Sequence, residues 1–384
     1  MIVPPATLGI LGGGQLGRYF VLAARTMGYR TIVLEPDPGS PAGAVADVHL
    51  VAAYDDAAAL DRMGAECAVV TTEFENPPAA ALRRLAAQTA VHPSPHAIGI
   101  TQDRRREKRF LAAAGIPVAP FEVIEDDDDV RRAMGGAFPA ILKSARLGYD
   151  GKGQVTVRDP DDLAGAWDAL GRVPAVLEQR LALAAELSVI LARNPFAPGA
   201  SLVAYPLCAN IHRNGILDVT VVPGPFVGEA FAIAERIAHA LEYTGVLAVE
   251  LFVVDGQIVV NELAPRPHNS GHWTLDYSAT SQFEQQVRAI CGLALGDTSL
   301  TVQAAAMANL LGDEWLHGEP RWERALIEPT AKLHLYGKSE PRPGRKMGHL
   351  TVAAASPAEA ESLARRTRSA TGSATGSATG PPAR

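Results

Sequence analysis

Two glutamates in adjoining apolar segments are the first candidates for chemistry. Glu250 lies in residues 247–254 and Glu262 in residues 257–263, on either side of Asp255-Gly256. An ionised carboxylate in an apolar strand is costly unless something pairs with it. A divalent cation relieves that cost, and Mg²⁺ favours one or two carboxylates together with substrate phosphates. We therefore expect Glu250 and Glu262 to hold Mg²⁺, with pairing to arginine or lysine as the alternative.

The turn between the two segments decides whether the glutamates meet. Asp255-Gly256 predicts a tight hairpin turn. A two-residue turn pairs Glu250 with Asn261 and puts Glu262 on the other face of the sheet. An odd-length loop or a β-bulge pairs Glu250 with Glu262 instead. The magnesium hypothesis therefore predicts one of these two irregularities.

A glycine-rich segment follows Lys143, which ends a predicted strand. Residues 148–154 read Gly-Tyr-Asp-Gly-Lys-Gly-Gln and lead into another predicted strand. The backbone amides of such a loop can close over phosphates, with Lys143 and Lys152 offsetting the negative charge. An ordinary glycine-rich hairpin is the alternative. Glu178 ends a further strand, where adenine and ribose could be bound.

Two loops are dense in hydrogen-bond donors. Residues 266–273 read Arg-Pro-His-Asn-Ser-Gly-His-Trp and follow directly on the second glutamate strand. Residues 342–349 read Arg-Pro-Gly-Arg-Lys-Met-Gly-His and are preceded by Lys338. Loops that leave such strands often bind substrate, and converging arginine and lysine suit a monophosphate.

The segment from Gly12 to Gly17 fits the pattern GxGxxG, and Glu35 follows 18 residues beyond Gly17. In a dinucleotide-binding fold, such glycines approach a pyrophosphate and the acid binds ribose. An NAD-dependent oxidoreductase is therefore one alternative function. A tight strand–helix turn without a ligand is the other interpretation of this motif.

Three sets of elements must position these residues. Short strands alternate with helices over the first hundred residues, which predicts a doubly wound, Rossmann-like parallel sheet. A helix at 103–114 precedes a small α+β unit, and longer, antiparallel strands begin near residue 187. The predicted fold is thus mixed α/β and α+β. We expect domains at residues 1–103, 104–183 and 184–368, a small terminal subdomain from about residue 325, and a disordered Ser-Ala-Thr-Gly tail at 369–384.

Composition narrows the class of protein. The length of 384 residues predicts two or three domains. A hydrophobic fraction of 47% is typical of a globular protein. The balance of 35 basic and 42 acidic residues gives a net charge of −7, so we expect no nucleic-acid partner. No apolar run reaches the length of a membrane span and no secretory signal is visible at the start, so we expect a cytoplasmic protein. Cys67, Cys208 and Cys291 are far apart and are expected to be buried.

In this order, the segments resemble the ATP-grasp superfamily, and within it the 5-(carboxyamino)imidazole ribonucleotide synthases of purine biosynthesis. The resemblance covers residues from about 7 to about 355. It rests most on Asn261 to Trp273 and on Arg342 to His349. Residues 9–18, the segment Thr72-Glu73-Phe74-Glu75 and residues 148–154 also carry it.

The resemblance implies a three-domain fold in which ATP, bicarbonate and 5-aminoimidazole ribonucleotide give ADP, phosphate and the N5-carboxylated ribonucleotide through carboxyphosphate. It implies a homodimer with Mg²⁺, or Mn²⁺, on Glu250 and Glu262. The residues implied to bind ATP are Arg104, Lys143, Gly148, Tyr149, Asp150, Gly151, Lys152, Gly153, Gln154, Glu178, Gln179, Glu186, His212 and Asn261. Those implied for the ribonucleotide and bicarbonate are Gln15, Leu16, Glu73, Tyr149, Asp150, Arg266, His268, Asn269, Ser270, Lys338, Arg345 and Lys346. Asp150, Tyr149, Lys143 and Arg266 are the implied catalytic residues.

Three other functions compete with this one. Another ATP-grasp carboxylate–amine ligase, such as a formate-using glycinamide ribonucleotide transformylase, shares the fold, but the two donor-rich loops argue against it. The NAD-dependent oxidoreductase leaves Lys143, the glycine-rich loop and the glutamate pair unexplained. A non-catalytic ATP-binding regulator would keep the motifs without turnover.

Overall fold

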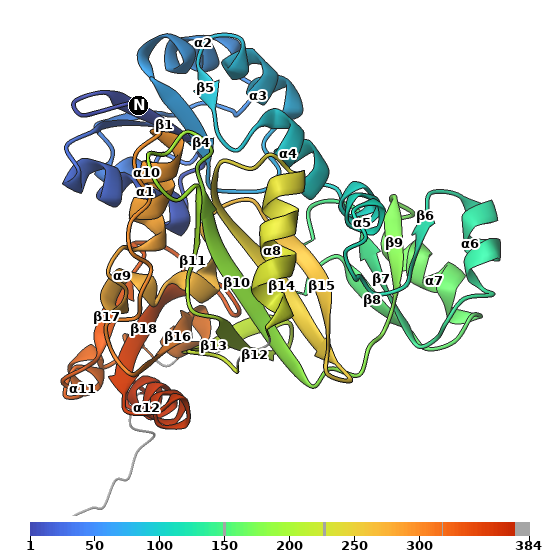
Figure 1. Cartoon of the computed structure of the whole chain (residues 1–384). Helices are drawn as coiled ribbons and strands as arrows, with labels where there is room; N and C mark the ends of the chain where they lie inside the picture. Colours follow the sequence, from blue (N-terminus) through green and yellow to red (C-terminus); the bar gives the residue numbers. More distant parts are fainter. Residues whose placement is uncertain (149–150, 226–227, 317, 373–384) are drawn as a thin grey trace, which may run out of the picture.

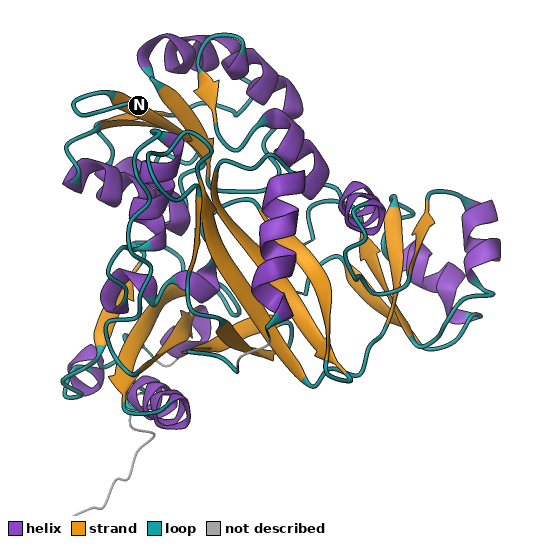
Figure 2. Ribbon diagram, viewed as in Figure 1, coloured by secondary structure: helices purple, strands orange, loops and turns teal. Residues whose placement is uncertain are grey.

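The computed structural model describes residues 1–148, 151–225, 228–316 and 318–372. The described residues form three sheets, and each sheet with its helices is called a body below. Figure 1 shows the body with the largest sheet in contact with the other two. Helices cover the faces of each sheet (Figure 2). The predicted combination of a parallel sheet with antiparallel α+β units is confirmed.

The first body is a five-stranded parallel sheet in the order β3-β2-β1-β4-β5. Predicted strands and helices alternate as expected, although β3 and α4 were not predicted. Helix α10 (Gln282–Ile290), from the other half of the chain, packs Val287 and Ile290 against Leu8 and Ile10 of this sheet. The elements are β1 Thr7–Leu11, α1 Gln15–Thr26, β2 Arg30–Leu34, η1 Gly43–Val45, β3 Val48–Leu50, α2 Ala57–Glu66, β4 Val69–Thr72, α3 Ala79–Ala86, β5 Ala90–Val91 and α4 Pro95–Thr101.

The second body is a four-stranded antiparallel sheet in the order β6-β9-β7-β8, which we call the lid. Helix α5 (Arg104–Ala113) leads into it from the first body. The lid strands enclose a small core that includes Leu142, Val157 and Trp167. Its elements are β6 Phe121–Ile124, α6 Asp127–Ala133, β7 Ala140–Ser144, β8 Gln154–Val157, α7 Asp162–Ala169 and β9 Ala175–Gln179.

The third body is a nine-stranded sheet in the order β15-β14-β10-β12-β13-β16-β18-β17, with β11 paired to β10. Helix α8 packs on the face formed by β10, β14 and β15. The strands are β10 Ala185–Arg193, β11 Leu202–Ala204, β12 Cys208–Arg213, β13 Ile216–Val222, β14 Gly245–Val254, β15 Gln257–Ala264, β16 Ala304–Leu311, β17 Lys332–Leu335 and β18 Lys346–Ala354. The helices are α8 Glu229–Ala240, η2 Asn269–Gly271, α9 Thr274–Tyr277, α10 Gln282–Ile290, η3 Gly312–Trp315, α11 Trp322–Ala325 and α12 Pro357–Ser369.

The last part of the chain extends this same sheet. Strand β16 pairs with β13, and β18 and β17 follow outward. Helix α12 is fastened to β13 because Asp218 accepts bonds from Arg365 and Arg368, both at 2.6 Å. The segment from about residue 325, expected as a small terminal subdomain of the third domain, therefore shares its sheet with the third body.

Two boundaries differ from the expectations. The sequence pattern predicts an amphipathic helix over residues 226–243. The helix there, α8, spans Glu229–Ala240, and residues 226 and 227 lie outside the described residues. At the other end of the chain, Thr371 falls in the segment expected to be disordered. It is buried, and its carbonyl accepts a hydrogen bond of 2.8 Å from the Arg321 amide. The remaining tail residues, 373–384, lie outside the described residues.

Two sequence expectations can be compared directly with the structure. Cys67, Cys208 and Cys291 are buried and free, as predicted. Among the residues described, none of the helices is both long and apolar enough to cross a membrane.

Candidate active site

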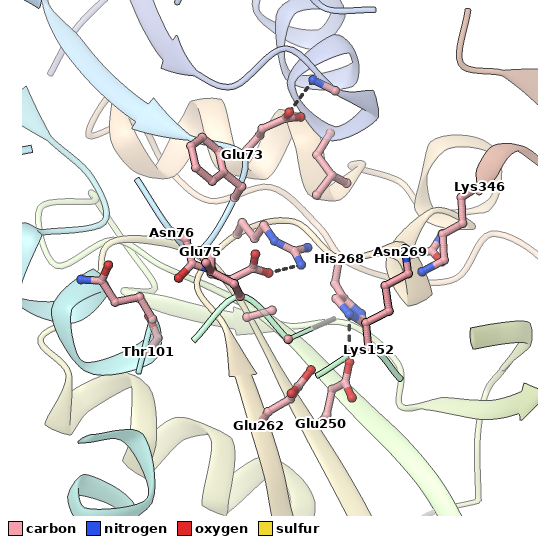
Figure 3. A pocket seen from close by; sticks show the side chains of 18 of the residues that line it. Glu73, Glu75, Asn76, Thr101, Lys152, Glu250, Glu262, His268, Asn269 and Lys346 are labelled. Carbon is pink, nitrogen blue, oxygen red and sulfur yellow. Dashed lines mark hydrogen bonds and ion pairs between the residues drawn. The ribbon is translucent and has the colours of Figure 1, made fainter. Parts of the chain in front are cut away.

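A cavity of about 750 Å³ lies where the three bodies meet. Its wall combines the start of α1, the segment after β4, helix α5, the loop between β7 and β8, strands β14 and β15, and the loop before β18. In Figure 3, Glu250 and Glu262 lie next to each other on one side, and Glu73 lies on the opposite side. All three bodies must therefore be in place for the cavity to exist.

The hairpin of β14 and β15 places the two glutamates opposite each other. The turn has two residues, since Val254 pairs with Gln257. The register then shifts between Glu250 and Leu251, so that Glu250 pairs with Glu262 while Leu251 pairs with Val260. Asn261 is the extra residue of a β-bulge. The irregularity that the magnesium hypothesis predicts is present, in the form of a bulge.

Each of the two carboxylates is bound by cationic or polar groups of the chain. Arg104 donates to Glu262 at 2.7 Å, and the Nε2 atom of His268 lies 3.0 Å from Glu250. Asn261 donates to Glu250 at 3.4 Å. Burial acts to raise the pKa of Glu250, but the hydrogen bond and charge of His268 outweigh it and hold the pKa at about 2. Two adjacent, ionisable oxygen donors at the wall of a polar cavity fit a hard divalent cation.

A buried ion-pair network lies between the lid and the glutamate hairpin. Lys143 binds Glu178 at 2.9 Å, and Lys108 lies 3.5 Å from the other oxygen of Glu178. Burial acts to raise the pKa of Glu178, but the two lysines outweigh it and lower the pKa. Lys143 also reaches the side-chain oxygen of Asn261 at 3.5 Å. The network thus joins lid strands β7 and β9 to the bulge in β15.

A second polar pair lies beside the hairpin. On β10 and β12, Glu186 lies 3.0 Å from His212. Burial acts to lower the pKa of His212, but Glu186 outweighs it and raises the pKa. Both side chains are part-exposed, and β10, which carries Glu186, pairs with β14, the strand that carries Glu250.

The backbone amides of the GxGxxG turn donate hydrogen bonds to carboxylates of the chain itself. The Gly13 amide donates to Glu35 at 2.8 Å, and the Gly17 amide donates to Glu73 at 2.6 Å. The Gly14 amide also donates to Glu73, and Tyr54 donates to Glu35. Because acids of the chain fill the positions that a pyrophosphate and a ribose would need, the geometry argues against the NAD alternative.

The donor-rich loops reach the cavity from two directions. Arg266 pairs with Glu75, and His268 bonds Ser270 at 2.8 Å through Nδ1. Lys338 donates to Gln15 at 2.5 Å and to the carbonyl of Lys346 at 2.7 Å. The bond to Gln15 joins residues 323 apart in the sequence. The beginning and end of the chain therefore build one wall of the cavity.

A cluster of imidazoles lies outside the cavity wall, around Asp276. His334 binds Asp276 at 2.9 Å, and His349 bonds the Tyr336 hydroxyl at 2.9 Å. The rings of His334 and His349 are stacked, with centroids 4.5 Å apart and planes within 10° of parallel. A metal binds in the plane of an imidazole, and one ion cannot lie in two stacked planes. We therefore interpret Asp276, His334 and His349 as packing and hydrogen-bonding groups.

The structure brings many of the residues expected from sequence to the cavity wall. Those that line it are Gln15, Leu16, Glu73, Arg104, Gly148, Lys152, Glu250, Glu262, Arg266, His268, Asn269, Lys338, Arg345 and Lys346. Those that do not line it are Lys143, Gly151, Gly153, Gln154, Glu178, Gln179, Glu186, His212, Asn261 and Ser270. The hydroxyl of Ser270 is buried against Ser188 at 2.7 Å. Tyr149 and Asp150 lie outside the described residues.

Sequence reasoning missed several residues of the wall, among them Glu75, Gln102, Glu107 and Arg146. Glu75 could have been found, because it follows a parallel strand at its carboxyl end, where such sheets bind ligands. Glu107 lies in the charged run of residues 104–109, whose pattern is compatible both with a phosphate contact and with a solvated helix face. It is 2% exposed, and burial raises its pKa to about 8.

Comparisons with known proteins agree over most of the chain. Three family models match successive segments: the ribonucleotide synthetase preATP-grasp domain over residues 5–102, the ATP-grasp domain over 109–283, and the phosphoribosylaminoimidazole carboxylase C-terminal domain over 305–363. An N5-carboxyaminoimidazole ribonucleotide synthase of Brucella melitensis is 45% identical over 356 residues, which is 91% of this chain and 96% of the relative.

Solved structures show the same similarity. An N5-carboxyaminoimidazole synthetase of Staphylococcus aureus complexed with ADP is 35% identical, with a TM-score of 0.88 over 96% of this chain and 98% of that chain. An N5-carboxyaminoimidazole synthase of Aspergillus clavatus in complex with ADP and 5-aminoimidazole ribonucleotide is 29% identical. Its TM-score is 0.85 over 95% of this chain and 98% of that one.

Proposed function

The chain belongs to the family of N5-carboxyaminoimidazole ribonucleotide synthases, and from this membership we propose that it carboxylates 5-aminoimidazole ribonucleotide with bicarbonate at the expense of ATP. The enzyme is an ATP-dependent ligase of purine biosynthesis. The observation that carries the proposal is the bulge that sets Glu250 opposite Glu262, in a cavity that also contains the two donor-rich loops.

The nucleotide would lie between the lid and the glutamate hairpin. Lys143, Lys152 and the amides of residues 148–154 would neutralise and orient its phosphates, since phosphoryl transfer needs positioning and charge compensation above all. Arg104 is held by Glu262 and lines the cavity, so it is well placed to move to a phosphate. Glu178, Gln179, Glu186, His212 and Asn261 would complete the nucleotide site.

The glutamate pair would hold Mg²⁺ or Mn²⁺. The donor set fits, because two carboxylates face each other at the wall of the cavity. The alternative pairing to arginine is present at Glu262, so Arg104 would have to release this carboxylate when a cation binds. When bound, the cation would neutralise charge on the transferred phosphate. Glu262→Ala should abolish ATP turnover, and chelation by EDTA should do so reversibly. Turnover that survives both would refute the metal role of this pair.

The ribonucleotide would occupy the opposite side of the cavity. Lys338, Arg345 and Lys346 offer the positive charge that suits its phosphate, and Arg266, His268 and Asn269 border the place where the two substrates would meet. Gln15, Leu16, Glu73 and Ser270 complete this half of the proposed site. Bicarbonate would be activated as carboxyphosphate, which the closed lid must protect from water. For Asp150 and Tyr149 we propose roles in orienting the amine and accepting its proton, on the strength of the family resemblance.

The decisive assay measures ADP release with Mg-ATP and bicarbonate, with and without 5-aminoimidazole ribonucleotide. Strong stimulation by the ribonucleotide is expected. Stimulation instead by formate and glycinamide ribonucleotide would favour the transformylase alternative. ATP binding without any turnover would favour a regulator.

We further propose a cytoplasmic homodimer, in keeping with the family resemblance. Light scattering during gel filtration should give about twice the 40.4 kDa mass of the chain. A mass of one chain at micromolar concentration would refute the dimer.

A further inference from the structure

The bulge in β15 leaves backbone groups that the sheet alone does not satisfy. Strand β15 is at the edge of the nine-stranded sheet, so its outer N–H and C=O groups face away from β14. Buried backbone groups of this kind need partners. Helix α5 supplies them from side chains: Lys108 donates to the carbonyl of Asn261 at 2.9 Å, and Glu107 accepts from the Leu263 amide at 3.2 Å.

These two contacts are made to the backbone of the residues on either side of Glu262. One fixes the residue before Glu262 and the other fixes the residue after it. Arg104, one helical turn earlier on the same face of α5, binds the Glu262 side chain itself. A single helix face therefore holds the backbone on both sides of Glu262 as well as its carboxylate.

The burial of these side chains argues against a mere surface contact. Lys108 is 0% exposed and Glu107 is 2% exposed. Charged groups are almost never buried this completely unless they are paired, because desolvation costs several kcal/mol. Leu111, one turn further along α5, is also buried and anchors this face of the helix against the core under β15. Ordinary apolar side chains would fill this space at lower cost, but they could not bind the carbonyl and the amide.

Lys108 also connects the bulge to the lid. Its amino group lies 3.5 Å from Glu178 of β9, which in turn binds Lys143 of β7. The same side chain thus touches the lid and the backbone of the hairpin. A displacement of α5 would change both contacts together.

We propose that Glu107 and Lys108 are positioning residues, which hold the β15 bulge in the register that sets Glu262 opposite Glu250. This inference rests on the proposed function of the two glutamates as the cation site. Glu107 and Lys108 act through the backbone of Asn261 and Leu263, and neither is assigned a contact with substrate.

The test measures ADP binding by calorimetry with Mg²⁺ and, separately, with EDTA. Lys108→Met keeps the length of the side chain but cannot donate to Asn261. We expect it to weaken Mg·ADP binding by about 10–100-fold, the usual effect of losing a partner of a metal ligand. Binding of ADP in EDTA should change much less than binding with Mg²⁺, and any loss that remains in EDTA measures the perturbation of Glu178, which Lys108 also contacts. Arg368→Met is the matched control, because it removes bonds to Asp218 and to the Asn309 backbone carbonyl, and none of these three residues lines the cavity.

Glu107 provides an independent pair of variants. Glu107→Gln keeps an oxygen that accepts from Leu263 and should bind Mg·ADP within about threefold of the wild type. Glu107→Met loses the acceptor and should show the same selective loss as Lys108→Met. If Lys108→Met does not fold, this pair decides the question.

Two results would overturn the inference, and they are distinguishable. If the Lys108 and Glu107 variants lose thermal stability as Arg368→Met does but bind Mg·ADP normally, their role is structural only. If the wild type binds ADP equally well in Mg²⁺ and in EDTA, the proposed cation site itself fails.

Discussion

The buried network around Glu178 predicts that Glu178→Gln loosens the lid. The substitution preserves volume but removes the only negative charge that touches both Lys108 and Lys143 in the described network. Glu178 is 3% exposed, and removing one partner of a buried ion pair costs about 3–5 kcal/mol. The lower end applies here, because Lys108 keeps the Asn261 carbonyl and the Lys143 side chain retains 11% exposure. About 3 kcal/mol corresponds to roughly a hundredfold in the opening equilibrium.

Hydrogen exchange measures this opening locally, which suits a chain of several domains. Amides of β7 and β9 should lose about a hundredfold in protection at pH 7, and those of β1 and β2 should be unchanged. Glu122→Gln, at an exposed position of β6 in the same sheet, is the control and should have no effect.

The deficit should depend on pH with a definite sign. Burial lowers the pKa of Lys108, and Glu178 opposes that effect. In Glu178→Gln, Lys108 therefore has a lower pKa in the folded protein than in the unfolded chain. At a pH below the ordinary lysine pKa, the folded protein then binds fewer protons than the unfolded chain, so the stability of the variant rises as the pH rises. The loss of protection should shrink between pH 7 and pH 9.5. The reasoning is refuted if Glu178→Gln loses no more hydrogen-exchange protection at pH 7 than Glu122→Gln does. It is also refuted if the loss of protection grows as the pH rises.

Three further predictions follow from contacts elsewhere in the molecule. Gly12→Ala should destabilise the protein by about 1–3 kcal/mol, because φ at Gly12 is +106° and a Cβ there would lie 2.3 Å from a side-chain carbon of Glu73. Gly99→Ala is the control, since a Cβ at this position of α4 meets open space, and it should leave the melting temperature equal or slightly higher. The arginines around Asp218 outweigh its burial and lower its pKa, so the stability of the wild type should fall as the pH drops below about 4. Asp218→Asn should be less stable at pH 7, but its urea midpoint should fall less than that of the wild type between pH 5 and pH 3. Parallel curves of urea midpoint against pH would contradict this. Lys338→Met should raise the KM for the ribonucleotide about tenfold or more with kcat nearly unchanged, since one charge-assisted contact is worth about 1.5–3 kcal/mol, and an unchanged KM would remove Lys338 from the phosphate site.

The sequence was sufficient to predict those features that depend on local pattern. Alternating strands and helices predicted the parallel sheet of the first body. The magnesium hypothesis predicted either an odd-length loop or a bulge, because the two glutamates could share a cation only if the hairpin slipped by one residue, and the structure has the bulge. Strand β16, by contrast, was not predicted: Ala304, Ala305, Ala306 and Ala308 have high helix propensity, and only the neighbouring strands β13 and β18 make this segment extended.

The contacts that hold the site could not be predicted in the same way. Arg104 and Glu262 are 158 residues apart, and Lys108 and Asn261 are 153 apart. No local periodicity encodes such pairs. Arg104 of α5 was predicted as a site residue, but the pattern of charges did not show that Glu107 and Lys108 would be buried, which they are because β15 offers them an amide and a carbonyl. Their role depends on a tertiary arrangement that a single sequence does not display.

The packing of α10 on the first sheet has a consequence for synthesis on the ribosome. Gln286 bonds Thr71 at 2.9 Å, the Ile2 amide bonds the Cys291 carbonyl at 2.7 Å, and Val287 and Ile290 cover apolar residues of β1. At about 5–20 residues per second, α10 emerges roughly 10–40 s after the first sheet is complete. During that interval the nascent chain exposes an apolar face that nothing in its own sequence can yet cover. The first hundred residues, expressed alone, should therefore aggregate or bind chaperones, although a family model treats them as a domain in their own right.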